Sequence, residues 1–523
     1  MEALDTARIL ATLPERLSGI PRRWAERAPQ ASALHDGARH WTYAELAAAV
    51  DETAALLRAL QVRPGDRLMV VGENCAAQVA LIFAAAEVDA WIVNVNGRLS
   101  AREVDQILSH CGARRVIYLA TPGDGSASAP LPSSPESAAH GQRHAAVPTP
   151  SPFGAWMIGA LNPDCTLEPV HADSARQVAA LIYTTGTTGQ PKGVMLTHRN
   201  LLFIAAVSST LRGLTPTDRA YGVLPITHVY GLASVMLGTL CAGACLYLCP
   251  RFTPDAVLKA IRDDGLTILQ GVPAMYARLL ETLGGGEQIK SQLRFIYAGG
   301  SPLAPSLKAQ VQQLFGLPLH NGYGLTETSP TVSQTRLDRP RNDASVGQVI
   351  PGVEVRLVDA GGDDVAPGVD GELWVRGPNI MAGYYREPEL TAAAMRDGGW
   401  LNTGDVARQD ADGALFIVGR TKELIIRSGF NVYPLEVETV LNAHPAVTQS
   451  AVVGRNAADG NEEVVAFVEI DPRHRITPEE LQQYLAGLLS PYKCPSEIIA
   501  MQALPAAATG KILKGQLRQL AQK

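Results

Sequence analysis

The chain has 523 residues, of which 46% are hydrophobic and 6% aromatic, with 45 Lys plus Arg against 51 Asp plus Glu. Single hydrophobic cores stop growing near roughly 250–300 residues, so this length excludes one ordinary domain and predicts several units. The composition is too apolar for a disordered chain, and the net charge of −6 disfavours a binder of the nucleic-acid backbone.

The cysteines and the N-terminal residues indicate the compartment. The 7 cysteines are an odd number spread along the chain, which does not resemble a disulfide framework. The first residues mix acids and bases and lack an apolar core, so they do not resemble a secretory signal. We expect a cytoplasmic protein without a nucleic-acid partner, and a homodimer stays an open alternative.

Short apolar runs alternate with helical patterns in the first part of the chain. We expect strands at residues 67–72, 91–95 and 115–119, and helices at residues 77–86 and 101–111. Capping boxes begin two helices, one at Thr42 with Glu45 and one at Ser100 with Glu103. This βαβ order is typical of a mostly parallel sheet.

The segment 121–152 is rich in Pro, Ser, Ala and Gly. It holds too little apolar surface to offset the entropy of ordering, so we expect a flexible low-complexity excursion within a larger domain.

Residues 221–250 contain no Lys, Arg, Asp or Glu. A membrane-spanning helix is one interpretation, but prolines, glycines and hydroxyl residues divide the stretch into short pieces. We therefore expect a strand, a loop, a small-residue helix at about 232–242 and a buried strand at 244–248. Cys241, Cys245 and Cys249 lie in this stretch, and we favour core packing for them over a metal site.

Beyond residue 340 the pattern changes to short strands with turns, at residues 353–358, 371–376 and 415–418. These predict a β-rich subdomain. A compact α+β unit follows, with strands near 449–453 and 463–470 and a helix that begins after Thr477.

A loop dense in Gly and Thr follows an apolar run in residues 181–194 and ends at Lys192. Backbone N–H groups, hydroxyls and the lysine ammonium suit phosphate oxygens. The loop lacks the Gly-Lys-Ser/Thr ending of the usual P-loop, so a P-loop NTPase is disfavoured.

This loop, Tyr-Thr-Thr-Gly-Thr-Thr-Gly-Gln-Pro-Lys-Gly, resembles the phosphate-binding signature of the adenylate-forming enzymes, which include acyl- and aryl-CoA synthetases, luciferases and adenylation domains. Further motifs of that family follow in the family's order: Asn321-Gly-Tyr-Gly-Leu-Thr-Glu-Thr328, Gly371-Glu-Leu-Trp-Val-Arg-Gly377, Asn402-Thr-Gly-Asp405, Gly419-Arg-Thr-Lys-Glu423 and Thr509-Gly-Lys511. The resemblance implies an α/β fold with a large N-terminal domain, 1–418, of two αβ lobes and a β-rich subdomain. It also implies a hinge at 419–422 and a small mobile α+β domain at 423–523.

The family joins a carboxylate to the α-phosphate of ATP, releases pyrophosphate and then transfers the acyl group to a thiol. By resemblance Glu327 holds Mg²⁺, Thr326 binds the α-phosphate, and Lys511 lies between the substrate carboxylate and that phosphate. Asp405 would bind the ribose with Arg420 beside it, because a carboxylate accepts two hydrogen bonds from a vicinal diol. The other ATP and AMP contacts implied are Thr184, Thr185, Gly186, Thr187, Thr188, Gly189, Lys192, Gly299, Gly300, Ser301, Tyr323 and Gly324.

Thioester formation needs a second arrangement of the same cleft. Lys422 occupies the family's hinge position, and the CoA tunnel is implied at Ser428, Gly429 and Phe430. Within the charge-free stretch, His228 is implied as a gate or carboxylate neighbour. The remaining acyl-pocket residues implied are Val229, Tyr230, Gly271, Val272, Tyr297, Ala298 and Gly322.

None of these pocket residues is charged, which favours a monocarboxylic acid with an apolar body over malonate. We predict an AMP-forming CoA ligase with ATP, Mg²⁺ and CoA, and favour a fatty acid as its substrate. Three alternatives stay open: an aryl acid, transfer to the phosphopantetheine of a carrier protein, and a degenerate relative that acts as a scaffold or sensor.

Overall fold

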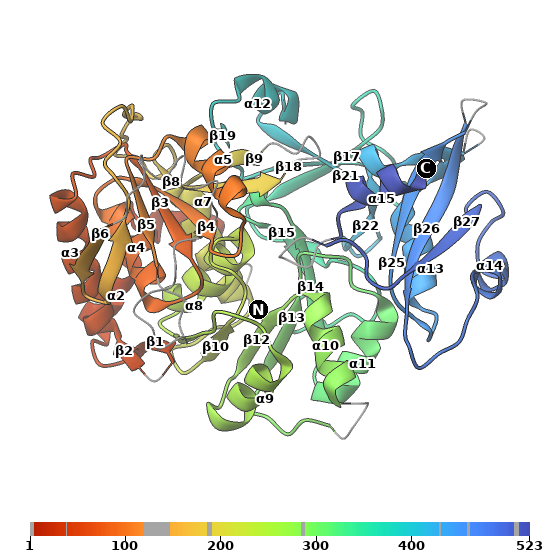
Figure 1. Cartoon of the computed structure of the whole chain (residues 1–523), viewed down its shortest axis with the longest axis horizontal. Helices are drawn as coiled ribbons and strands as arrows, with labels where there is room; N and C mark the ends of the chain where they lie inside the picture. The colour runs from red at the N-terminus through yellow and green to blue at the C-terminus, as the bar shows by residue number, and fades with distance from the viewer. Residues whose placement is uncertain are drawn as a thin grey trace.

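The structure is a computed structural model that describes residues 5–37, 39–119, 147–185, 191–283, 288–427, 430–457, 461–506 and 512–522. Two large sheets with their helices form the N-terminal body, a smaller antiparallel sheet adjoins them, and the C-terminal unit lies at the right of the view (Figure 1). The predicted α/β architecture of two lobes, a β-rich subdomain and a C-terminal domain is confirmed.

The first lobe contains an eight-stranded sheet in the order β19-β9-β8-β4-β3-β5-β7-β6. Its strands are β3 (Arg67–Gly72), β4 (Trp91–Asn96), β5 (Arg115–Tyr118), β6 (Val147–Ser151), β7 (Gly154–Ile158), β8 (Val178–Thr185), β9 (Pro191–Thr197) and β19 (Gly383–Tyr384). The pairs β3–β4, β3–β5 and β4–β8 are parallel, as the βαβ order predicts.

The helices of this lobe follow the expected pattern. They are α1 (Thr6–Thr12), α2 (Gly19–Arg27), α3 (Tyr43–Ala59), α4 (Ala76–Glu87), α5 (Ala101–Cys111) and α7 (His198–Leu211). Both predicted capping boxes form, at Thr42 with Glu45 and at Ser100 with Glu103. Helix α4 is buried along its length and contacts strands of both large sheets, which explains its apolar sequence.

The second lobe contains a nine-stranded sheet in the order β16-β15-β14-β13-β12-β10-β11-β1-β2. Its strands are β1 (Ser32–Asp36), β2 (Arg39–Thr42), β10 (Arg219–Gly222), β11 (Cys245–Leu248), β12 (Ile268–Gly271), β13 (Phe295–Ala298), β14 (Leu319–Gly324), β15 (Thr331–Gln334) and β16 (Gln348–Val349). Helices α9 (Pro254–Asp263), α10 (Pro273–Leu283) and α11 (Pro305–Phe315) connect its parallel strands.

The charge-free stretch forms buried elements of the second lobe. A π-helix, Tyr230–Leu237, replaces the first part of the predicted helix and continues as α8 (Gly238–Cys241). Gly231 permits this wide turn, because a Cβ there would lie 2.1 Å from the carbonyl oxygen of Pro225. The three cysteines of the stretch belong to the hydrophobic core or lie against it. None of the helices described is long and apolar enough to cross a membrane.

The predicted excursion differs from the structure at its end. Residues 120–146 lie outside the described ranges, but 147–151 form strand β6, which pairs with β7. The strand contains prolines, and it lies at the edge of the sheet, where a missing N–H leaves no partner unsatisfied.

The β-rich subdomain and the C-terminal domain complete the fold. The first contains β17 (Glu354–Val358), β18 (Gly371–Arg376), α12 (Pro388–Ala394), β20 (Met395–Arg396), β21 (Trp400–Gln409) and β22 (Leu415–Arg420). The second contains β23 (Ile425–Arg427), β24 (Phe430–Val432), α13 (Pro434–Asn442), β25 (Val447–Asn456), β26 (Glu462–Ile470), α14 (Pro478–Ala486), β27 (Glu497–Met501) and α15 (Lys514–Ala521). Thr477 caps α14 as predicted.

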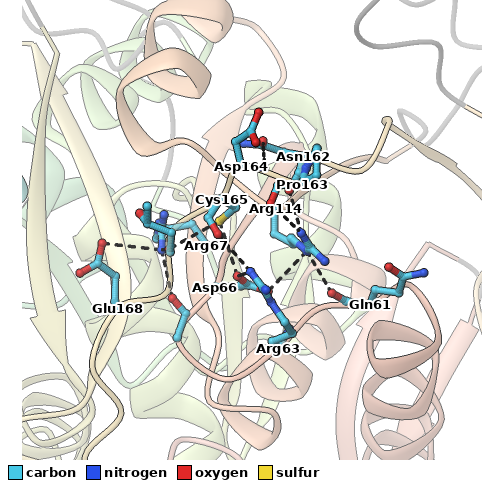
Figure 2. Close-up of polar contacts among 12 residues, drawn as sticks. Gln61, Arg63, Asp66, Arg67, Arg114, Asn162, Pro163, Asp164, Cys165 and Glu168 are labelled. Atoms are coloured by element: carbon cyan, nitrogen blue, oxygen red, sulfur yellow. Dashed lines mark hydrogen bonds and ion pairs between the residues drawn. The ribbon is translucent and has the colours of Figure 1, made fainter.

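Two buried arginines fasten the segment that leads to β8 onto the first sheet (Figure 2). The guanidinium of Arg67 donates to the carbonyl oxygens of Gly65, Cys111 and Thr166 and lies 3.6 Å from the carboxylate of Glu168. Arg114 donates to the carbonyl of Asn162 and lies 3.8 Å from Asp66. These two buried guanidinium groups therefore meet backbone carbonyls and each lies near a carboxylate, while Nη2 of Arg67 has no hydrogen-bond partner among the described residues.

Candidate active site

A cleft of about 4130 Å³ is lined by residues of both lobes, the β-rich subdomain and the C-terminal domain. Many residues singled out in the sequence line it, although they are far apart in the chain. They are Thr184, Lys192, His228, Val229, Tyr230, Val272, Tyr297, Gly299, Gly300, Ser301, Gly322, Tyr323, Gly324, Thr326, Glu327, Asp405, Arg420 and Lys422.

The other predicted residues fall into two groups. Gly271, Ala298 and Phe430 lie in β12, β13 and β24 but are not among the residues that line the cleft. Outside the described residues or side chains lie Thr185, Gly186, Thr187, Thr188, Gly189, Ser428, Gly429 and Lys511.

Glu327 is held by a residue that sequence reasoning missed. It lies in the 3₁₀ turn Thr326–Thr328, and its carboxylate Oε1 accepts a hydrogen bond of 2.8 Å from the hydroxyl of Tyr384. Lys192 Nζ lies 5.6 Å from the centroid of the same ring. Burial, and then the charge of Glu327, raises the pKa of Tyr384, so its hydroxyl remains a donor. Tyr384 thus contacts both the carboxylate of Glu327 and the ammonium of Lys192 on one wall of the cleft.

Strand pairing produces this arrangement. Lys192 at the start of β9 pairs with Thr184 at the end of β8, and Tyr384 of β19 pairs with Val194 of β9. The short strand β19 therefore carries the tyrosine to the phosphate-loop strands from almost two hundred positions away. No motif in the sequence around Tyr384 signals this contact.

Asp405 is a buried carboxylate with two partners. Its Oδ1 lies 2.9 Å from Nε of Arg420, which is opposite it in the β21–β22 pair, and its Oδ2 accepts a hydrogen bond from Tyr323. Burial opposes the charge on Arg420, but Asp405 and its neighbours raise the pKa of that guanidinium overall. A carboxylate offers about four acceptor positions, so Asp405 retains capacity for hydroxyl donors of a ligand.

Two tyrosines and several glycines shape the inner part of the cleft. Tyr230 begins the π-helix and Tyr297 lies on β13, with ring centroids 6.3 Å apart at an interplanar angle of 64°. A Cβ on Gly322 would lie 1.8 Å from the hydroxyl oxygen of Tyr297, and one on Gly299 would lie 3.3 Å from both rings. Glycine at these positions therefore makes the close approach of the rings possible.

His228 lies at the entrance of the π-helix. Its side chain is half-buried, lines the cleft and accepts a hydrogen bond at Nδ1 from the backbone N–H of Tyr230, at 3.2 Å. This hydrogen bond fixes the orientation of the imidazole, and the side chain still lines the cleft.

The cleft is also lined by a cation that is not among the uncharged residues predicted for the acyl pocket. Arg212, the C-cap of α7, is 2% exposed, and its guanidinium carbon lies 4.5 Å from the ring centroid of Tyr297. A basic residue at a helix C-terminus is ordinarily explained by the helix dipole, so the sequence carries no signal of this role.

The C-terminal domain contributes its first turn and last helix. Lys422 and Glu423 belong to the 3₁₀ turn Thr421–Glu423, which follows β22. Lys514 Nζ of α15 lies 2.8 Å from Glu423 and 2.8 Å from Glu438 of α13. The ring of Phe430 stacks on Tyr492 at 4.6 Å. These contacts tie the end of the chain to the turn where the predicted hinge lies.

The donor set fits magnesium and does not fit a structural metal centre. Among the residues described, no group of three or more His, Cys, Asp or Glu could hold a metal ion. Mg²⁺ is usually held by one or two carboxylates together with water and substrate phosphates, which suits Glu327 beside Thr326.

Comparison with known proteins identifies the protein family. Residues 21–385 match the model of the AMP-binding enzyme family, and residues 436–511 match that of its C-terminal domain. The chain is 36% identical over 506 residues to feruloyl-CoA synthase of an Amycolatopsis species, covering 96% of this chain and 98% of the relative. It is 33% identical over 509 residues to indoleacetate–CoA ligase of Aromatoleum aromaticum, covering 95% and 96%.

Solved structures of two further proteins are also similar to this chain. ATP-bound MatB from Rhodopseudomonas palustris has 30% identity and a TM-score of 0.81, over 96% of this chain and 98% of that one. MenE of Bacillus subtilis, in complex with ATP and a magnesium ion, has 28% identity and a TM-score of 0.79, over 95% and 98%. The chain belongs to the AMP-binding enzyme family. It is an AMP-forming acid–CoA ligase whose reaction uses ATP, Mg²⁺ and CoA.

Proposed function

We propose that this ligase activates an aryl monocarboxylic acid, first as the acyl-adenylate and then as the CoA thioester. The observation that carries the proposal is a slot in the cleft that is lined by the rings of Tyr230 and Tyr297 and by Gly299 and Gly322, whose lack of a Cβ leaves room for a flat ring beside the tyrosines. The relatives named for ferulate and indoleacetate also favour an aromatic acid. The fatty acid favoured from the sequence has no such support and becomes the competing candidate.

The first step brings two anions together, so cations and oriented donors must offset their repulsion. We assign the β- and γ-phosphates to the loop at 184–192 with Lys192, the α-phosphate to Thr326, and the ribose hydroxyls to Asp405. Glu327 would hold Mg²⁺, which supplies charge neutralisation at the phosphates. Tyr384 orients the Glu327 carboxylate through the hydrogen bond to its Oε1. By family resemblance, Lys511 places its ammonium between the carboxylate and the α-phosphate.

The second step requires the thiol to reach the same carbonyl carbon. We assign the rotation of the C-terminal domain to Lys422, at the junction of β22 and the following turn. The rotation would remove Lys511 from the cleft and bring up the loop of Ser428, Gly429 and Phe430, which would form the pantetheine tunnel. His228 would act as the gate beside the acyl carboxylate.

AMP release with CoA tests the substrate class. A panel of aryl and fatty acids of matched carbon number should give kcat/KM values at least roughly ten-fold higher for the aryl acids, because a ring fills the slot that a flexible chain must be ordered to enter. Higher values for the fatty acids would overturn the proposal. Dependence on an added carrier protein in place of CoA would favour the alternative acceptor.

Lys511→Ala separates the two half-reactions. We expect it to slow acyl-adenylate formation by a factor on the order of 10²–10³, as for loss of a group that stabilises transition-state charge. Thioester formation from preformed adenylate should change little. Equal loss in both half-reactions would contradict the assigned role.

A further inference from the structure

Around the inner end of the acyl slot, three buried residues have polar atoms without a hydrogen-bond partner in the described part of the chain. They are Nε of Arg212, Nε2 of Gln270 and the hydroxyl of Tyr230. All three residues are buried, with exposed fractions of 2%, 1% and 6%. Buried polar groups in native proteins are almost always hydrogen-bonded, and Arg212 and Tyr230 line the cleft, so their unpartnered atoms can meet an acceptor on a ligand there. Gln270 contacts Arg212 and is not among the residues that line the cleft.

Arg212 is the central member of this group. One of its terminal nitrogens donates to Oε1 of Gln270 at 2.8 Å, and the guanidinium lies over the ring of Tyr297. The nearby carboxylate of Asp218 is already bound by Arg294, at 2.7 Å from Nε and 2.5 Å from a terminal nitrogen. Over the ranges of the chain that the structure describes, Arg212 forms no ion pair with a carboxylate.

Within the described part of the chain, Arg212 differs from the arginines in Figure 2 by forming no ion pair with a carboxylate, although Nη2 of Arg67 also has no hydrogen-bond partner there. Arg67 and Arg114 are also buried, but each lies near a carboxylate and donates to backbone carbonyls. An isolated buried charge is costly unless an opposite charge or acceptor meets it. A cation–π contact alone offsets only part of that cost.

His320 and Tyr297, two groups whose pKa values respond to Arg212, are uncharged at physiological pH. Burial, then the charges of Lys308 and Arg212, lowers the pKa of His320 to about 4, so the imidazole is neutral at physiological pH. Burial raises the pKa of Tyr297 despite the neighbouring guanidinium, so its hydroxyl also stays protonated. Neither group supplies a negative charge to the guanidinium, and Arg212 and Tyr230 line the cleft.

We propose that Arg212 and Tyr230, with Gln270 positioning the guanidinium, form a specificity subsite for an oxygen acceptor on the aryl acid, at the end remote from the reacting carboxyl group. The acceptor is a ring carboxylate or a phenolic hydroxyl, and both supply the lone pairs that the unpartnered atoms of Arg212 and Tyr230 lack. The subsite deepens the proposed function, since it assumes that the ring occupies the slot.

The test compares benzoic or cinnamic acids that carry a carboxylate, a hydroxyl or a methyl group at the far end of the ring. Arg212→Met removes the cation and keeps the length of the side chain. We expect kcat/KM for the two oxygen-bearing acids to fall roughly 10- to 100-fold, as for a lost hydrogen bond to a charged group. For the methyl acids the change should stay within about 3-fold, because they make no such bond.

Gln270→Glu provides a second variant that retains the arginine. The new carboxylate would pair with Arg212 inside the protein, so the ring carboxylate should lose roughly ten-fold or more while the methyl acids are retained. Arg115→Met is the matched control. Arg115 is partly buried, donates to the carbonyls of Leu60 and Gly159, and does not line the cleft. Its loss should not change the ratio between acids.

Each outcome decides one question. An equal fall for all acids, or no change in the ratio, would overturn the subsite and leave Arg212 as a structural residue. A larger effect for the carboxylate than for the hydroxyl would identify the acceptor as anionic, and the reverse would identify a phenol. Failure of the unmodified enzyme to use any aryl acid would instead overturn the proposed function, independently of Arg212.

Discussion

Tyr384 and Glu327 are joined by a hydrogen bond of 2.8 Å from the tyrosine hydroxyl to carboxylate Oε1, across 57 positions of the chain. The same ring lies beside Lys192, so one tyrosine orders both the carboxylate that would hold Mg²⁺ and the lysine that would meet the phosphates. The wall of the cleft is therefore set by a residue from the short strand β19, not by the phosphate loop alone.

Tyr384→Phe keeps the ring and removes the hydrogen bond. Because partners of metal-binding carboxylates orient them, we expect the Mg²⁺ concentration for half-maximal ATP–pyrophosphate exchange to rise roughly ten-fold. The rate at saturating Mg²⁺ should change little. Tyr385→Phe is the neighbouring control, since that hydroxyl binds Glu168 at 2.6 Å. The same Mg²⁺ dependence in both variants would contradict the assignment.

Gly322→Ala tests the slot that the rings of Tyr230 and Tyr297 line. The added Cβ would lie 1.8 Å from the hydroxyl oxygen of Tyr297 and 2.7 Å from the carbonyl oxygen of Ser333, so the ring must move into the slot. We expect kcat/KM for aryl acids to fall roughly 10- to 100-fold, which corresponds to about 1–3 kcal/mol of strain. The KM for ATP should not change.

Gly487→Ala controls for the general effect of a methyl group at a glycine. The nearest atom to its Cβ would be 3.6 Å away, which is an ordinary contact. Unchanged use of aryl acids by Gly322→Ala would show that the ring of the substrate does not bind beside these tyrosines.

Lys514→Met removes two ion pairs at once, with Glu423 and Glu438 at 2.8 Å each. We expect the C-terminal domain to lose about 2 kcal/mol, because a largely buried, hydrogen-bonded charge pair is broken. Hydrogen exchange in α13 and β25 should be faster by roughly 30-fold, the same free energy expressed as a ratio. Burial opposes the charge of Lys514, but Glu438 and Glu423 raise its pKa overall, so this contribution persists throughout the neutral range.

Lys493→Met is the matched control for that variant. Among the residues that the structure describes, Lys493 forms an ion pair only with Glu436, and that glutamate side chain is 39% exposed, so the loss should stay below about 1 kcal/mol. Equal acceleration of hydrogen exchange in the two variants would show that the ion pairs of Lys514 stabilise the domain no more than that of Lys493.

Because the pKa of buried His198 is lowered, we expect the free energy of unfolding to decrease in acid. Its Nδ1 accepts a hydrogen bond from the N–H of Leu17, and burial, then the charge of Arg16, lowers its pKa to about 3. Between that value and the ordinary 6.5, the unfolded chain binds a proton that the folded chain does not. Stability therefore falls as the pH decreases through this window, by up to about 1.4 kcal/mol per pH unit.

Urea unfolding followed by tryptophan fluorescence between about pH 5 and pH 7 measures this slope. His198→Asn retains an acceptor for the N–H of Leu17 but has no group that titrates in this window. The slope of its free energy of unfolding against pH should therefore be smaller by up to about 1.4 kcal/mol per pH unit. Identical slopes in the two proteins would exclude His198 as the cause.

Local signals in the sequence predicted much of the fold. Residues 101–111 form a helix with the predicted bounds, because the capping box at Ser100 and the apolar period are contained within the helix itself. The strand at 67–72 is also as predicted. Strand β6 was missed because its pairing with β7 does not depend on hydrophobic side chains.

The candidate site was predictable only in part. Residues within the family motifs, such as Glu327 and Asp405, were identified by resemblance, and both line the cleft. Tyr384 and Arg212 lie outside those motifs, so no local pattern pointed to them. Their importance comes from contacts that form only when β19 pairs with β9 and the end of α7 meets β13.

By itself the sequence determined the class of chemistry and most of the helices and strands, because caps, periodicity and motif residues act within a few positions of one another. Only the tertiary structure decided which groups meet: Asp405 with Tyr323 across 82 positions, Glu327 with Tyr384, and Arg212 with Tyr297. Charge and hydrogen bonding depend on distance in space, and packing sets that distance for residues far apart in the chain. The cleft that contains the uncharged residues predicted for the acyl pocket is therefore also lined by a buried arginine.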